Sequence, residues 1–354
     1  MRWWWFGPSV TRAELDRELT VMAQAGLGGV EVAYVYPLPT ATTEFGSAAF
    51  LADLRYAAER AHELGLGFDL TLGSGWSFGG RHITPGLAAR QLYWDRREIG
   101  PGALELAMTS PWPGEQLIAA YVGAGSLLEQ PAGYEWLPVT DGRLRIEAGS
   151  APRVVLLGYA RPTGQNVKRA AAGAEGPVLD HYSAAATEAH LRAVGDPMLD
   201  AVPANLVGSV FCDSLEVYGA DWTELLPAEF ARRRGYELLP QLHLLTVDAP
   251  DAGRLRADYY HTLAELYGRT SSRSVSAGPL GEACPSESSH TERRPPPSAA
   301  IGSRTCSKAR AGAGAGFRRP AGRPRRRTCM GDQWSPPRPG PGCIPPPSAP
   351  PRWT

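Results

Sequence analysis

The first 90 residues alternate between strand-like and helix-like segments, and this alternation constrains the fold more than any other feature of the chain. Short apolar runs near residues 2–6, 29–35 and 67–72 are separated by amphipathic stretches at about 12–25 and 48–64. Thr11 stands at an N-cap position, Glu14 follows three residues later, and glycines end both stretches. Strands that alternate with helices through short glycine turns indicate βαβ units and a parallel sheet covered on both faces.

The middle of the chain has a different pattern, from about Arg96 to Ala174. It contains short β-like runs separated by turn signals and no helical stretch of useful length; the runs are 104–107, 117–122, 143–146 and 154–159. The βα pattern then resumes, with strands expected at 177–182 and 208–213 and a helix capped by Ser183. We therefore expect an α/β fold, an incomplete (β/α)8 TIM-like barrel with a β-rich insertion on one of its loops.

Four segments follow from this reading. Residues 1–95 carry the first barrel βα units, 96–175 the insertion, 176–270 further barrel units, and 271–354 a tail rich in Pro and Arg. The tail has only five Val, Leu, Ile and Phe residues in 84, too few to bury a core against chain entropy. It is expected to be a disordered tail or the product of a frameshift near residue 270, since Arg, Pro, Ala and Gly dominate shifted frames of GC-rich genes.

The zero formal net charge hides a division between the body and the tail. The tail holds fourteen Arg and Lys and four Asp and Glu, which leaves 22 basic and 32 acidic residues in positions 1–270. An acidic body argues against a nucleic-acid partner and suits an enzyme with a neutral or cationic ligand. There is no apolar run of about 18 residues and no signal peptide, so the sequence as written predicts no membrane partner and a cytoplasmic location.

Functional side chains of a barrel lie at the carboxyl ends of its strands and in the loops that follow. At those places this chain carries acidic and aromatic residues, a combination that suits sugars because aromatic faces stack on the ring and carboxylates bind hydroxyls. Glu216 is the candidate catalytic residue. The candidate substrate-binding residues are Glu31, Trp76, Asp180, His181, Asp213 and Tyr218.

Each candidate also has a structural alternative. Glu31 lies inside an apolar strand and needs a partner there, whatever its function. Asp180 and His181 could be a solvated strand end, and no His or Glu stands at a diagnostic spacing from His181 for a metal site, so the metal ligands are left unassigned.

Several motifs together resemble glycoside hydrolase family 106, the α-L-rhamnosidases. The first are Arg2-Trp3-Trp4-Trp5, Gly28-Gly29-Val30-Glu31-Val32 and Gly73-Ser74-Gly75-Trp76. The later ones are the run from Phe211-Cys212-Asp213 to Asp221-Trp222 and the run from Phe230 to Tyr236. The resemblance covers about residues 2–270, and its motifs are specific only in combination.

This resemblance implies an inverting hydrolase of terminal α-L-rhamnosides with a calcium ion in its site. It also implies a longer protein and allows export from the cell. The later strands, which would supply a second carboxylate, are not found here, so we expect an inactive fragment with Glu216 as the best candidate for the proton donor. The alternatives are a retaining glycosidase of another barrel family and a carbohydrate-binding protein without catalysis.

Overall fold

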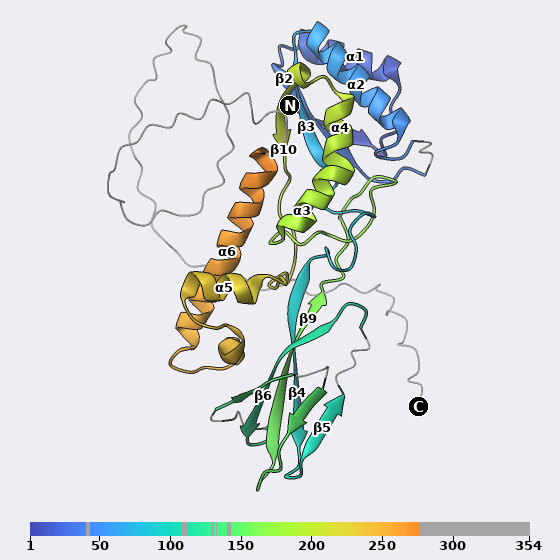
Figure 1. Cartoon of the computed structure of the whole chain (residues 1–354). Helices are drawn as coiled ribbons and strands as arrows, with labels where there is room; N and C mark the ends of the chain where they lie inside the picture. Colours follow the sequence, from blue (N-terminus) through green and yellow to red (C-terminus); the bar gives the residue numbers. More distant parts are fainter. Residues whose placement is uncertain (40–42, 108–111, 129–130, 132, 140–142, 277–354) are drawn as a thin grey trace, which may run out of the picture. The chain divides into compact units, whose positions relative to one another are not determined.

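The parallel sheet has four strands in the order β1-β2-β3-β10. They are β1 (Arg2–Phe6), β2 (Gly29–Val35), β3 (Gly67–Ser74) and β10 (Val207–Phe211). This computed structural model, shown in Figure 1, describes residues 1–39, 43–107, 112–128, 131, 133–139 and 143–276. The strands expected at 2–6, 29–35, 67–72 and 208–213 are all confirmed, and each pairs in parallel with its neighbour.

One face of this sheet carries the largest apolar core. Side chains that alternate along the strands, such as Trp3 and Trp5 in β1, lie on this face and are almost fully buried. The helices α1 (Arg12–Gln24), α2 (Ala48–Glu63) and α4 (Asp196–Ala201) pack against them. The period of two in the strands and of 3.6 in the helices therefore directs both sets of apolar side chains to the same core.

The opposite face of β1 is more open. Trp4 and Phe6 keep 39% and 50% of their surface exposed, whereas Trp3 and Trp5 keep 3% and 2%. Of the three consecutive tryptophans, two therefore belong to the core and one does not.

The helix starts agree with the sequence signals. The Thr11 hydroxyl accepts a hydrogen bond from the Glu14 amide, and the Ser183 hydroxyl accepts one from the Ala186 amide at the start of α3 (Ala184–His190). The Glu14 carboxylate pairs with Arg17. The Thr11 cap forms as predicted, and the Glu14 carboxylate is engaged by the same helix.

The middle of the chain forms antiparallel sheets. The larger one has the order β4-β9-β6-β7, and a smaller ladder joins β5 to β8. The strands are β4 (Arg90–Ile99), β5 (Leu104–Ala107), β6 (Gln116–Ala124), β7 (Glu135–Leu137), β8 (Arg143–Ile146) and β9 (Arg153–Pro162). The antiparallel part thus begins at Arg90 and ends at Pro162, whereas the sequence placed the insertion at 96–175.

A second core joins the larger antiparallel sheet to the last helices. Residues of β6 and β9, including Tyr121 and Leu156, pack with apolar residues of α5 (Leu226–Arg234), a 3-10 helix at Leu239–Leu245 and α6 (Ala252–Ser276). Gly235, with φ of 79°, ends α5 in the left-handed conformation that glycine allows.

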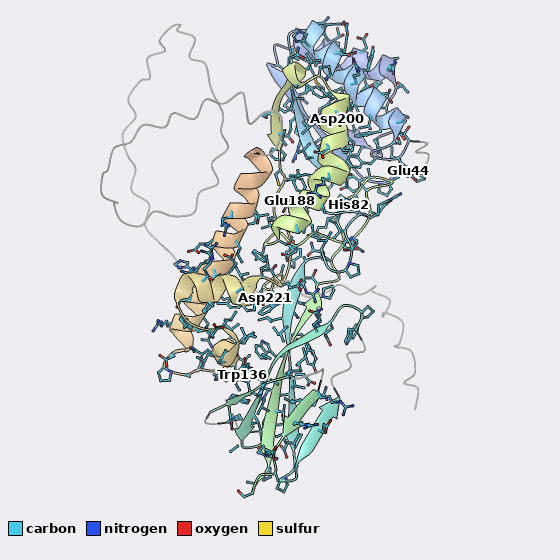
Figure 2. The ribbon with its side chains drawn as sticks, viewed as in Figure 1. Glu44, His82, Trp136, Glu188, Asp200 and Asp221 are labelled. Atoms are coloured by element: carbon cyan, nitrogen blue, oxygen red, sulfur yellow. The ribbon has the colours of Figure 1, made fainter. Side chains whose placement is uncertain are left out.

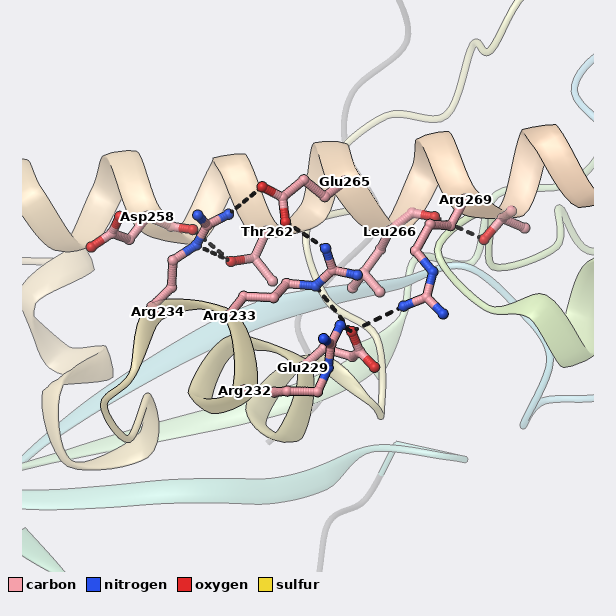
Figure 3. Close-up of polar contacts among 10 residues, drawn as sticks. Glu229, Arg232, Arg233, Arg234, Asp258, Thr262, Glu265, Leu266 and Arg269 are labelled. Atoms are coloured by element: carbon pink, nitrogen blue, oxygen red, sulfur yellow. Dashed lines mark hydrogen bonds and ion pairs between the residues drawn. The ribbon is translucent and has the colours of Figure 1, made fainter. Parts of the chain in front are cut away.

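Ion pairs connect α5 to α6 (Figure 3). Arg233 lies 3.0 Å from the Glu229 carboxylate of its own helix and 2.6 Å from the Glu265 carboxylate of α6. Arg234 bonds both Glu265 and the Thr262 hydroxyl. The Arg233 side chain is only 14% exposed, so it binds one helix to the other.

The prediction of a strand at 177–182 is wrong. Residues 177–179 make only isolated antiparallel bridges, Val178 with Gly79 and Leu179 with Ala88. Asp180 then accepts a hydrogen bond from the amide of Tyr182, which turns the chain into α3. The apolar run resembles a strand, but Pro177 offers no amide hydrogen to a ladder and the Asp180 turn ends the segment.

The chain between α3 and β10 is largely helical. A π-helical turn at Leu191–Gly195 joins α3 to α4, and a 3-10 turn at Ala204–Leu206 precedes β10. The described residues all belong to one compact unit. The predicted tail beyond Ser276 lies outside the described residues. Within the described residues, no helix is both long and apolar enough to cross a membrane.

Candidate active site

Glu216 lies in the segment that leaves the carboxyl end of β10, and four side chains contact its carboxylate. The Lys168 ammonium lies 3.0 Å from Oε2, and the Ser214 hydroxyl lies 3.2 Å from Oε1. The Tyr218 hydroxyl lies 3.4 Å from Oε2, and the Trp76 side chain also hydrogen-bonds this carboxylate. The site therefore combines a carboxylate, a cation and two aromatic side chains.

Backbone contacts from three separate segments fix this arrangement. Trp76 and Lys168 form an antiparallel bridge, with hydrogen bonds of 3.0 Å and 2.8 Å between their main chains. The side-chain amide of Gln165 donates to the main-chain carbonyl of Glu216 at 2.6 Å and accepts from the main-chain N–H of Tyr218 at 2.9 Å. The Glu216 amide donates to the Ser77 hydroxyl. The residues after β3, after β9 and after β10 thus meet at one place.

The charges at this place favour an ionised Glu216. The Lys168 ammonium lowers the pKa of the Glu216 carboxyl from its ordinary value, and the Ser214 and Trp76 hydrogen bonds act in the same direction. In turn, Tyr218 and then Glu216 raise the pKa of Lys168. Lys168 also stacks on the Tyr218 ring, at 4.2 Å from its centroid.

A second group of charges lies on the sheet beside this site. Arg2 donates to Glu31 at 3.1 Å and to Asp213 at 2.8 Å, and its guanidinium lies 4.8 Å from the ring centroids of both Trp4 and Phe211. Glu31 thus has the partner that its place in an apolar strand requires. Asp213 and Glu31 are drawn together by one arginine, while Glu216 is held by a lysine.

Asp180 and His181 have other surroundings. The Asp180 carboxylate accepts from the Thr223 hydroxyl at 2.6 Å, and burial raises its pKa to about 6. Burial lowers the pKa of His181 to about 4. The contacts of Asp180 support the turn before α3 and the entry to α5, and they do not connect it to Glu216.

A histidine pair lies behind β3, with His190 buried and His82 half-buried. His82 Nε2 is 3.0 Å from His190 Nδ1, and His190 Nε2 donates to the Leu72 carbonyl at 2.9 Å. Phe78 stacks on the His190 ring. Figure 2 marks His82 beside α3, the helix that ends in His190. These histidines hold the end of β3 in place.

Of the residues predicted from the sequence, the structure brings Trp76, Glu216 and Tyr218 together. Lys168, Gln165 and Ser77 contact them and were not among the predicted residues. Lys168 and Gln165 lie between residues 162 and 176, in the segment that was counted with the β-rich insertion. One signal was available for Lys168, because it is one of only two lysines in a chain that otherwise uses arginine.

The described residues offer no ready group of metal ligands. Among them, no three His, Cys, Asp or Glu side chains are placed so that they could hold a metal ion together. The carboxylates of Glu31 and Asp213 are paired with Arg2, and that of Glu216 with Lys168. The side chains in this part of the chain therefore do not form a calcium site by themselves.

Comparison with known proteins found a similar family over part of the chain. Residues 139–276, which include Lys168, Asp213 and Glu216, match the family model of the alpha-L-rhamnosidases, glycoside hydrolase family 106. Over these residues the chain is therefore similar to glycoside hydrolase family 106. No curated protein matches the chain.

The solved structures contain a similar fold. A rhamnosidase from Novosphingobium sp. PP1Y superposes with a TM-score of 0.56 at 15% identity over 78% of this chain. That identity supports a shared fold and nothing finer. The chain spans 44% of the length of that rhamnosidase.

Proposed function

We propose that this chain carries part of the active site of a hydrolase of terminal α-L-rhamnosides. The observation that carries the proposal is the group around Glu216, a carboxylate with the side chains of Trp76 and Tyr218 beside it. Glu216 and Tyr218 lie inside the stretch that matches the rhamnosidase family, and Trp76 lies before it. Trp76 and Tyr218 would offer apolar ring surface to the sugar, and Glu216 would act at the glycosidic bond.

The reaction would be a one-step displacement with inversion. In such a reaction a carboxylic acid protonates the leaving oxygen while a carboxylate on the other side of the sugar activates water, with the two carboxyl groups about 6.5–9.5 Å apart. Glu216 is one member of this pair. The other would come from sheet strands beyond the four described, which would complete a barrel, and for this reason we propose that the chain by itself turns over slowly or not at all.

The direct test is sugar binding followed by turnover. Purified chain is titrated with L-rhamnose by isothermal calorimetry, then incubated with an aryl α-L-rhamnoside, alongside Trp76→Ala and Glu216→Gln. We expect binding that Trp76→Ala weakens about tenfold or more, because an aromatic face supplies much of the contact to a sugar. A chain that binds no rhamnose, or that binds it equally well without Trp76, would remove this proposal.

If turnover is measurable, the anomer of the first product distinguishes the mechanism. NMR detection of the inverted sugar supports the one-step displacement, and retention would assign the chain to the other class of glycosidase. A protein that binds the sugar and shows no turnover, in this chain or in a longer form, would be a carbohydrate-binding protein.

A calcium ion is a separate proposal that rests on the family resemblance. The described side chains do not group as ligands, so no step of the reaction is assigned to the ion. The test is a melting curve after EDTA treatment and after calcium add-back. A ligand that binds only the folded state raises the melting temperature, and identical curves in both samples would exclude calcium binding by this chain.

A further inference from the structure

We propose that Lys168 is a positioning residue that holds Glu216 as the ionised member of the catalytic pair. This inference rests on the proposed function. It assigns Glu216 to activation of water and leaves protonation of the leaving oxygen to another carboxyl group. The sequence alone had favoured Glu216 as the proton donor.

The first argument is the geometry of the lysine. Its ammonium lies 3.0 Å from Glu216 Oε2 and 2.8 Å from the Tyr218 hydroxyl, which itself lies 3.4 Å from the same Oε2. Lysine has three donors and no acceptor, so both contacts are donated by the ammonium. The ammonium is therefore held between the Tyr218 hydroxyl and Oε2 of Glu216.

The second argument is that the backbone brings the lysine to this place. Lys168 is bridged to Trp76 through both of its main-chain groups, and Gln165 bonds the main chain of both Glu216 and Tyr218. A surface ion pair between two free side chains contributes little, because two long side chains must be ordered. Here the main chains that carry Lys168 and Glu216 are already held by hydrogen bonds, so less conformational entropy is lost when the two side chains pair.

The third argument concerns the chemistry of a proton donor. A general acid must stay protonated near the working pH, and enzymes achieve this by burial or by a neighbouring negative charge. Glu216 has the opposite surroundings: it is partly exposed, it faces a cation, and it accepts hydrogen bonds from Lys168, Ser214 and Trp76. These surroundings suit a carboxylate that accepts a proton from water.

The experiment uses the scarcity of lysine in this chain. Reductive methylation with ¹³C-formaldehyde labels only the amino groups of Lys168, Lys308 and the N-terminus. The chemical shift of the dimethyl-Lys168 signal is followed by NMR from pH 3 upward. We expect a low-pH inflection, which reports ionisation of the neighbouring Glu216, and no such inflection in the Lys308 signal.

Two variants make the result specific. Glu216→Gln should abolish the low-pH inflection, while Glu188→Gln, an exposed carboxylate on α3 paired with Arg192, should leave it unchanged. An inflection that survives Glu216→Gln, or a Lys168 signal that matches Lys308 at every pH, would overturn the proposal. Because the readout comes from a lysine that is methylated and not substituted, it does not depend on whether a lysine variant folds.

The functional arm follows the pH dependence of kcat/KM. If the chain or a longer form of it turns over a rhamnoside, Lys168→Met should shift the acid limb of that profile to higher pH, and Lys168→Arg should largely restore it. A loss of rate with an unmoved acid limb in Lys168→Met would mean that the lysine has no effect on the ionisation of Glu216. A chain that shows the Lys168 inflection but binds no rhamnoside would refute the proposed function. The effect of Lys168 on the ionisation of Glu216 would then still stand.

Discussion

The guanidinium of Arg2 lies 2.8 Å from the carboxylate of Asp213, and so the start of β1 is bonded to the segment that follows β10. These two strands are the edges of the described parallel sheet, with β2 and β3 between them. The same guanidinium holds Glu31 of β2. A single side chain therefore connects both edges of the sheet and one of its central strands, next to the site of Glu216.

Removing this arginine should destabilise the fold. In Arg2→Met the carboxylates of Glu31 and Asp213, each about one-fifth exposed, lose their cation, and we expect a loss of about 1–2 kcal/mol in the free energy of unfolding. The measurement is urea denaturation at neutral pH. Arg55→Met is the matched control, because Arg55 pairs with Glu59 on the exposed side of α2, where a loss of roughly 0.5 kcal/mol or less is expected. Equal losses in the two variants would contradict the role given to Arg2.

The sequence was sufficient for the elements whose signals are local. The strands of the parallel sheet follow from their apolar runs, and the Thr11 and Ser183 caps follow from single residues before helical patterns. The prediction of a strand at 177–182 failed because a short apolar run such as Val178-Leu179 resembles a strand whether or not it has a neighbour to pair with. The Asp180 turn and the bridges to Gly79 and Ala88 determine the conformation of this segment, and the bridges depend on residues distant in the sequence.

The candidate site was predictable in its acidic and aromatic members and not in its cation. Glu216 and Tyr218 could be found because they directly follow a strand that the sequence marks clearly. Lys168 lies about 50 residues earlier, after the antiparallel sheet, and it reaches Glu216 only because that sheet returns the chain to Trp76. The length of the inserted segment conceals such a contact from any argument based on spacing.

The histidine pair behind β3 should make the protein sensitive to acid. Burial lowers the pKa of His190 to about 4, below the usual value of 6.5, so the unfolded chain binds protons first as the pH falls. The stabilising contribution is complete above about pH 6.5 and is lost progressively toward pH 4, by up to about 3 kcal/mol for a fully buried group. The Asp180 carboxyl, with its pKa raised to about 6, acts in the opposite sense over the same range.

The measurement is therefore a comparison of variants. Urea denaturation at several pH values between 4 and 7 should give a shallower pH dependence for His190→Gln than for the wild type. His62→Gln, which changes an exposed histidine on α2, should keep the wild-type slope. If His190→Gln keeps the full slope, the acid sensitivity arises elsewhere.

Gly75 should be the position where the smallest substitution does the most damage to the site. Its φ is +66°, which an L side chain rarely adopts, and a Cβ there would lie 2.0 Å from the Lys168 carbonyl oxygen and 2.9 Å from the Ala170 amide nitrogen. Those atoms belong to backbone and cannot rotate away, so the segment that carries Lys168 must move. Gly26 provides the control, since its φ is +79° and nothing lies within 4 Å of a Cβ built on it.

Both alanine variants share the cost of a left-handed backbone, about 1–2 kcal/mol, and only Gly75→Ala adds the clash. We expect Gly26→Ala to lose about that amount in urea denaturation and Gly75→Ala to lose distinctly more. The ¹³C-methyl signal of Lys168 should move in Gly75→Ala and stay in place in Gly26→Ala, because only the first displaces the main chain that carries it. Equal stability losses and an unchanged Lys168 signal would show that the loop after β3 does not determine where the lysine lies.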